Sequence, residues 1–223
     1  MYKLNFNFLN KYGGMLLEGM WTTLALVVCC LAIGFVLGTV LGTVMALFKQ
    51  SKVKPLRWFA AVWVDVLRNT PFLVQIFFFY YGLPVLGINT DPLATAIIVL
   101  GINTSAPNCE IIRAGLMAVK KDYYECAAAL GYTRFQTLWY FVLPISLRVA
   151  FKSLVNNFVN LVLTSSVCFS ITVVETMGAA KIIVGRVSRP FEVYLLILVC
   201  YCIFTYIVSF AAKLIDKKIR IEL

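Results

Sequence analysis

The sequence predicts an all-α integral membrane protein with about five transmembrane helices. Of the 223 residues, 61% are apolar and only 13% are charged, and the mean hydropathy is +0.89. This composition is too hydrophobic for an ordinary soluble domain. The apolar residues gather in long runs, and the length leaves no room for a sizeable soluble domain beside them. We therefore expect one transmembrane domain over residues 1–223.

The first predicted span covers residues 16–48 and contains Gly34, Gly38 and Gly42. Their four-residue spacing places the three glycines on one face of a helix. Small residues at this spacing let two membrane helices approach closely. We therefore expect this face to pack against another helix.

Four more spans are expected further along the chain. The second is interrupted by Asp65, Arg68 and Pro71, and the third contains Glu110 and Arg113, which are three residues apart and can pair on one helix. A polar, helix-forming segment separates the third span from the fourth. The expected spans are residues 58–86, 92–119, 143–174 and 194–215, and the polar segment is 120–142.

The basic residues orient these spans. An external N-terminus puts 14 lysines and arginines on the cytoplasmic side and five outside, with Arg68 left in the second span. This is the positive-inside bias, so we expect a cytoplasmic C-terminus and a cytoplasmic segment 120–142. The net charge of +10 is explained by this bias, so no nucleic acid partner is expected. The basic tail can also contact anionic membrane lipid.

The sequence argues against an enzyme and against a bound cofactor. It contains seven cysteines, no histidine and no Cys-x-x-Cys spacing, so the usual metal ligand sets cannot be assembled. It also contains no Gly-x-x-x-x-Gly-Lys-[Ser/Thr] loop for the phosphates of ATP. Any ATP-driven process would need a second polypeptide.

The polar segment carries a specific motif at residues 125–131, which read Glu-Cys-Ala-Ala-Ala-Leu-Gly. The small residues allow close approach of another surface, and Gly131 can supply a turn that other residues resist. This block resembles the EAA loop of ABC importer permeases, a helix-turn-helix that docks on the ATPase. Cys126 stands where the family usually has alanine. The residues that the resemblance assigns to coupling are Glu125, Ala127, Ala128, Gly131 and Pro144.

Two further stretches narrow the resemblance. Residues 68–75 resemble the Arg-Gly-Thr-Pro-Leu-Leu-Val-Gln segment of polar amino acid permeases of the histidine, glutamine and arginine type, with Asn69 in place of the glycine. Residues 110–116 resemble the Glu-Ile-x-Arg-Ala-Gly segment before their EAA loop. Residues 163–166 depart from the Lys-Asp-Thr-Ser that many relatives carry.

The resemblance implies a type I ABC importer permease fold with a cytoplasmic coupling loop, in a bacterial cytoplasmic membrane. It implies a cytoplasmic ATPase dimer that binds ATP and Mg, and an external solute-binding protein that delivers an amino acid. It also implies a second permease, either another copy of this chain or a related one. Which amino acid is carried is left open.

Candidate pathway residues lie mainly in the fourth span. Asn156, Asn160 and Thr164 share one helix face, where they can line a substrate route or form hydrogen bonds between helices. Glu175 can meet the amino group of a substrate or cap a loop. Gln75, in the second span, is the remaining candidate.

The leading functional hypothesis is a permease subunit of an ATP-driven amino acid importer, coupled to its ATPase through the EAA loop. The alternative is a secondary transporter or channel for small polar solutes that needs no ATPase. That class would require buried ion-coupling carboxylates or an inverted repeat. Acidic residues within the spans are few, and five spans do not divide into equal halves.

Overall fold

The computed structural model describes residues 3–219, and within them every regular element is a helix. Among these residues, four helices are long and apolar enough to cross a membrane, or five if the bent pair α3–α4 is one span. The elements are α1 (Phe8–Cys29), η1 (Cys30–Phe35), α2 (Val36–Gln50), α3 (Lys54–Asn69), α4 (Phe72–Val85), α5 (Pro92–Ala118), α6 (Lys121–Ala129), α7 (Arg134–Thr137), η2 (Leu138–Val142), α8 (Leu143–Thr164), η3 (Ser165–Ile171), α9 (Thr176–Val187) and α10 (Pro190–Ile219).

The first span is longer than its apolar run. α1, the π-helical η1 and α2 form one continuous helix of 43 residues, Phe8–Gln50, where residues 16–48 were expected. The additional N-terminal turns are stabilised by packing, because Phe8 and Leu16 are buried with Ile183 of α9 and Ile197 of α10. At 1.5 Å per residue this helix is about 65 Å long, roughly twice the hydrocarbon thickness of a bilayer.

The glycine face of the first helix packs against α5, as expected. A Cβ atom on Gly38 would lie 2.7 Å from the carbonyl oxygen of Gly101. A Cβ atom on Gly42 would lie 2.8 Å from the Cβ of Asn108 and 2.9 Å from the backbone nitrogen of Cys109. No side chain fits in these gaps, so the prediction of a close helix contact is confirmed.

The second apolar run is two helices and not one straight span over residues 58–86. α3 begins at Lys54, and the chain bends by 108° between α3 and α4. Pro71 cannot donate a helical hydrogen bond, and it restricts the residue before it to an extended conformation. Thr70 accordingly has φ −111° and ψ 137°. The chain therefore turns at Thr70 and Pro71.

The later helices also begin before their expected starts. A continuous helix runs over 38 residues, Arg134–Ile171, where 143–174 was expected. It begins early because Thr133 and Gln136 form a capping box that satisfies free backbone N–H groups. The stretch expected to connect the last two spans contains α9, and α10 then begins at Pro190 instead of residue 194. The third span, α5, agrees with its expected bounds to within one residue.

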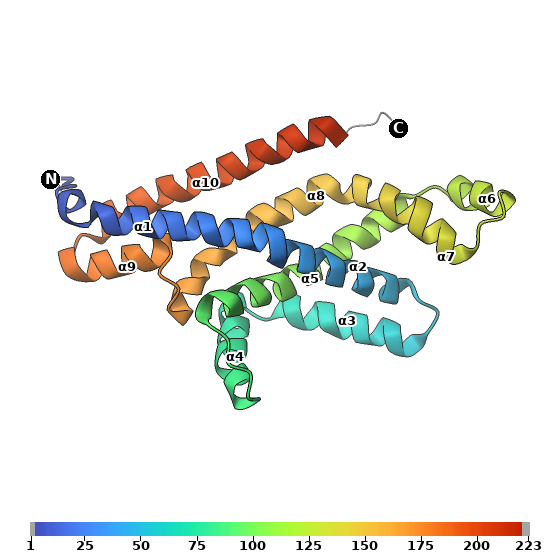
Figure 1. Cartoon of the computed structure of the whole chain (residues 1–223), viewed down its shortest axis with the longest axis horizontal. Helices are drawn as coiled ribbons and strands as arrows, with labels where there is room; N and C mark the ends of the chain where they lie inside the picture. The colour runs from blue at the N-terminus through green and yellow to red at the C-terminus, as the bar shows by residue number, and fades with distance from the viewer. Residues whose placement is uncertain (1–2, 220–223) are drawn as a thin grey trace.

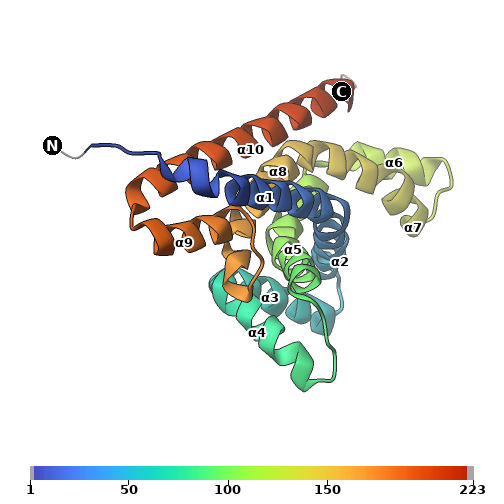
Figure 2. The same cartoon turned by 60° about the vertical axis from the view of Figure 1, so that its left-hand side comes forward.

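Most of the helices lie roughly along one long axis, and α4 runs across it (Figure 1). The start of α1, α9 and the start of α10 form one end of the molecule, and α6 and α7 form the tip of the other. In the turned view α3 and α4 lie below α5, and α4 projects from the body (Figure 2). The loop between α2 and α3 lies toward the same end as α6, α7 and the end of α10.

Candidate functional site

The EAA-like segment folds as a short helix followed by a tight turn. α6 ends at Ala129, and Gly131 follows with φ +81°. The N–H of Gly131 donates to the carbonyl of Ala128 at 3.0 Å, and the N–H of Tyr132 donates to the carbonyl of Ala127 at 3.0 Å. These two bonds make a Schellman motif, which places its residue of positive φ at this position. The turn expected at Gly131 is therefore present.

The small residues of α6 face two ways. Ala127 is only 3% exposed, so it packs within the chain. Glu125 and Ala128 are exposed, as is Gly131, and a Cβ atom on Gly131 would meet nothing within 4 Å. The side of α6 that carries these residues is therefore open to another protein.

Large apolar side chains are also exposed on this segment. Exposed apolar surface on an otherwise polar hairpin is typical of a protein or membrane contact. Inside the hairpin, the rings of Tyr132 and Phe141 pack edge to face with centroids 5.0 Å apart. The exposed set is Tyr123, Tyr124, Leu130, Tyr132, Phe135, Trp139 and Tyr140.

Pro144 lies inside the long helix and not at its start. The proline ring clashes with the carbonyl four residues earlier, which belongs to Tyr140. Tyr140 lies in the π-helical η2, whose wider turn precedes α8 directly. A π-helical turn is a common device at functional sites and accommodates an irregular hydrogen-bond ladder. The proline therefore coincides with the transition from the coupling segment to α8.

The asparagines of α8 divide into two sets. Asn157 donates to Oδ1 of Asn108 at 2.7 Å, and Asn108 donates to Oγ1 of Thr39 at 3.1 Å, which joins α8, α5 and α2. Asn156 and Asn160 are exposed, and Thr164 donates to the carbonyl of Asn160 at 2.8 Å. The hydrogen bonds between helices thus come from Asn157, one residue away from the predicted pathway face.

Asn156 has a defined setting. It lines a cavity of about 110 Å³ between α8 and α10, together with Lys152, Ser209 and Lys213. The cavity also has apolar walls, including Val155. The amide of Asn156 therefore lies at a groove between two membrane helices, where a polar group can contact a substrate or a partner protein.

Glu175 acts as a cap within the chain. Its carboxylate accepts hydrogen bonds from the backbone N–H groups of Met177 at 2.8 Å and Gly178 at 3.0 Å, and from the hydroxyl of Tyr201 at 2.8 Å. The side chain is 1% exposed. These contacts fit the capping alternative, because they satisfy the first turn of α9 and tie it to α10.

Gln75 holds the corner between α3 and α4. Its Nε2 donates to the carbonyl of Leu67 at 2.9 Å, and to the carbonyl and hydroxyl oxygens of Thr70 at 3.0 and 2.7 Å. Its Oε1 accepts a hydrogen bond from Asn103 of α5 at 2.9 Å. Gln75 is 7% exposed, so its contacts stabilise the bend and its attachment to α5.

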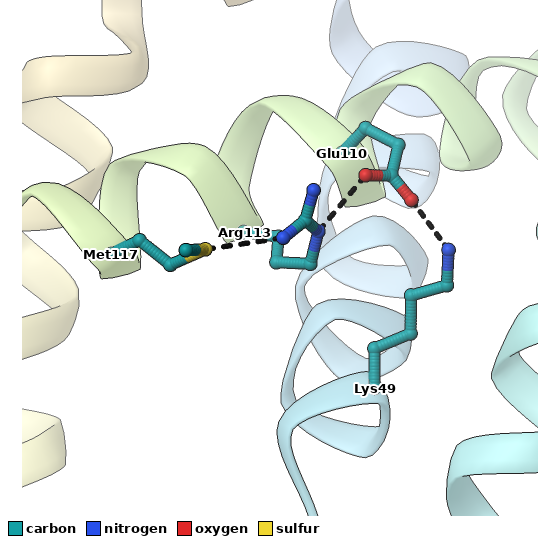
Figure 3. Close-up of polar contacts among 4 residues, drawn as sticks. All are labelled: Lys49, Glu110, Arg113 and Met117. Atoms are coloured by element: carbon teal, nitrogen blue, oxygen red, sulfur yellow. Dashed lines mark hydrogen bonds and ion pairs between the residues drawn. The ribbon is translucent and has the colours of Figure 1, made fainter.

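A cluster of ionic side chains joins α2 to α5 (Figure 3). Glu110 accepts from Arg113 at 2.9 Å, the pair expected from the spacing, and also from Lys49 at 2.5 Å. Arg113 in turn donates to the sulfur of Met117 at 3.1 Å. Lys49 was not expected here, because sequence spacing does not show that the end of α2 lies beside Glu110.

Comparison with known families identifies the chain. Residues 38–221 match the family described as binding-protein-dependent transport system inner membrane component. The chain belongs to this family. Its members are membrane-embedded components of transport systems, which agrees with the apolar helices described above. The prediction of an importer permease is confirmed at this level.

Individual relatives of this inner membrane component agree with the assignment. The chain is 32% identical over 188 residues to the L-cystine transport system permease protein TcyB of Bacillus subtilis, covering 84% of this chain and 80% of TcyB. It is 31% identical over 217 residues to the probable glutamine ABC transporter permease protein GlnM of the same organism, covering 97% of this chain and 99% of GlnM. A solved amino acid ABC transporter with histidines superposes with a TM-score of 0.82 at 30% identity, covering 98% of this chain and 100% of that one. The predicted fold class is confirmed.

Proposed function

We propose that this chain is the permease subunit of an ATP-driven importer of amino acids, coupled to a separate ATPase through α6. The relatives that are named for cystine and glutamine transport support the substrate class. The observation that carries the coupling role is the α6 turn, where Gly131 takes φ +81° beside an open surface. ATP and Mg belong to the partner ATPase in this scheme.

A continuous helix provides the mechanical connection. The chain leaves the turn at Thr133 and enters the helix Arg134–Ile171, which carries Asn156 and Asn160. Because this helix is continuous from Arg134 to Ile171, displacement of α6 by the ATPase would be passed along it to the pathway residues. ATP and a loaded binding protein would then bias the transporter between inward-open and outward-open states.

The proposed orientation places the N-terminus outside and α6 in the cytoplasm. The distribution of lysine and arginine supports it, and so does the arrangement of the helices. The basic loop between α2 and α3 lies toward the same end as α6 and the end of α10 (Figure 1). An external solute-binding protein would meet the opposite end, formed by α1, α9 and the start of α10.

The proposed pathway needs a second permease. Asn156 and Asn160 are exposed on the single chain, and polar side chains facing lipid are costly. A second copy or a related permease facing this side of α8 would enclose them along a route for a zwitterionic substrate. The proposed pathway does not include Glu175 or Gln75, because the hydrogen bonds of these side chains hold α9 and the bend between α3 and α4.

Reconstitution tests this proposal directly. The tagged chain is purified from its native membrane, and the proteins that copurify are identified. We expect an ABC ATPase among them. We also expect that proteoliposomes containing this complex take up amino acids only when ATP is present inside the vesicles and is hydrolysed there. Uptake by the chain alone, without an ATPase, would instead establish a secondary transporter or channel.

A further inference from the structure

A basic cavity of about 380 Å³ lies where the N-terminal segment, the end of α9 and the start of α10 meet. Its walls combine three cations with amide groups and an aromatic ring. None of the described residues that line it is acidic. A lining of this kind complements an anion. The polar lining residues and the ring are Lys11, Arg186, Arg189, Asn5, Asn7 and Tyr12.

Two of the cations contact the same aromatic ring. Lys11 Nζ lies 5.5 Å from the centroid of the Tyr12 ring, and the Arg186 guanidinium carbon lies 5.8 Å from it. Within residues 3–219, neither cation forms an ion pair. Both cations line the same cavity, so an anion that enters it would meet two positive charges that no carboxylate neutralises. Arg189 differs, because it donates to Glu192 at 3.1 Å.

Apolar surface begins beside the cavity. On α10, Phe191 is 59% exposed and Leu198 is 62% exposed, and Tyr194 lies between them on the exposed surface. On α1, Leu17 is 66% exposed. On a membrane helix such faces meet acyl chains, and basic or aromatic groups at their ends lie at the headgroup level. A phospholipid could fill the cavity with its headgroup and lay its own acyl chains on the adjoining apolar surface, whereas a soluble anion could only fill the cavity.

We propose that this cavity binds the phosphate group of an anionic phospholipid. The guanidinium of Arg186 and the ammonium of Lys11 would donate to the phosphate oxygens, which accept such charge-assisted bonds strongly. The amides of Asn5 and Asn7 would meet the rest of the headgroup, and the acyl chains would lie along α10. The proposal holds for either membrane orientation of the chain.

The test is a titration of the purified, assembled transporter in detergent, followed by native mass spectrometry. The probes are a short-chain phosphatidylglycerol, a short-chain phosphatidylcholine and inorganic phosphate. We expect the phosphatidylglycerol to bind most tightly. The double variant Lys11→Gln, Arg186→Gln should bind phosphatidylglycerol about 30-fold more weakly, and each single variant about fivefold more weakly. Each basic residue near an anionic lipid contributes about 1 kcal/mol, which is about fivefold in affinity.

Two controls separate charge and folding from the site. Lys181→Gln removes a cation that also lies on α9, 4.8 Å from the ring centroid of Phe169 and outside the cavity, and it should leave binding unchanged. The charge-conserving variant Lys11→Arg, Arg186→Lys should retain lipid binding. Assembly of every variant is checked by size-exclusion chromatography.

Three results would overturn the proposal. The first is unchanged phosphatidylglycerol binding by an assembled double variant. The second is inorganic phosphate binding as tightly as the lipid, which would assign the cavity to a free anion. The third is a double variant that still binds the lipid but no longer binds the solute-binding protein when that protein is added to it. This result would assign the cavity to acidic side chains of that partner.

Discussion

The N–H of Tyr132 donates to the carbonyl oxygen of Ala127 at 3.0 Å, closing the end of α6 around Gly131. This bond fixes the direction in which the chain leaves α6 for the long helix that carries the asparagines of α8. The geometry of one turn therefore connects the proposed docking surface to the proposed pathway.

The first prediction concerns this turn. Gly131→Trp should insert and fold, because its Cβ would meet nothing within 4 Å in this chain. The positive φ adds strain of about 1 kcal/mol, and the indole would project into the space that the ATPase is proposed to occupy. We expect ATP hydrolysis without transport, measured as both rates in proteoliposomes.

Gly131→Asn is the matched control, because asparagine tolerates positive φ and is much smaller than tryptophan. It should keep most of the coupling. Normal transport by an assembled Gly131→Trp complex would show that this turn does not dock on the ATPase.

The second prediction separates the two sets of asparagines. Changing Asn160 and Thr164 to leucine should lower transport about 30-fold, since two hydrogen bonds of about 1 kcal/mol each are removed from the route. Thermal stability should change little, because both side chains face away from the chain core. Transport and melting temperature are measured on the same preparation.

Asn157→Leu should behave in the opposite way. It strands Oδ1 of Asn108, and the free energy of unfolding should fall by about 1–2 kcal/mol. Complexes that assemble should transport at a normal rate. If the Asn160 and Thr164 variant instead lost assembly and kept its rate per complex, the pathway assignment would fail.

The third prediction concerns the contact of α2 with α5. Gly42→Ala places a methyl group 2.9 Å from the carbonyl oxygen of Ser105 and from the backbone nitrogen of Cys109. Backbone atoms cannot move aside cheaply, so we expect a loss of about 1–3 kcal/mol in thermal or denaturant unfolding. Gly14→Ala has open space around its Cβ and should be neutral or slightly stabilising. Equal stability of the two variants would contradict the described contact.

The fourth prediction concerns orientation. In a variant without native cysteines, Asn5→Cys should react with an impermeant maleimide added outside the cell. Thr133→Cys should react only after permeabilisation. The opposite labelling pattern would invert the proposed topology and place α6 outside, beyond the reach of a cytoplasmic ATPase.

The sequence supported the class, the family and the glycine face, because hydropathy and spacing are local properties that survive in the fold. The helix starts were harder to predict. Phe8 and Leu16 extend α1 through contacts with α9 and α10, which are distant in sequence. The capping box of Thr133 and Gln136 was readable from the sequence, and it would have placed the start of the fourth helix correctly.

Side-chain roles within the helices depended on tertiary contacts. Gln75 and Glu175 carry polar groups at positions that permit either a pathway or a structural role, and only their partners separate the two. The carboxylate of Glu175 accepts hydrogen bonds from two backbone N–H groups and from Tyr201. The amide of Gln75 donates to Thr70 at the bend between α3 and α4. Likewise Asn156 and Asn157 are adjacent in the sequence, and the packing of α8 on α5 gives them opposite surroundings.

A photo-cross-linking measurement tests the central claim most directly. Cys126 is exposed on α6, and Cys202 is exposed on α10. A photoreactive maleimide is attached to each in chains that keep only that cysteine, within the assembled transporter. Docking of α6 on the ATPase predicts an ATPase adduct from Cys126 and none from Cys202. An active complex that gives no ATPase adduct from Cys126 would contradict coupling through α6.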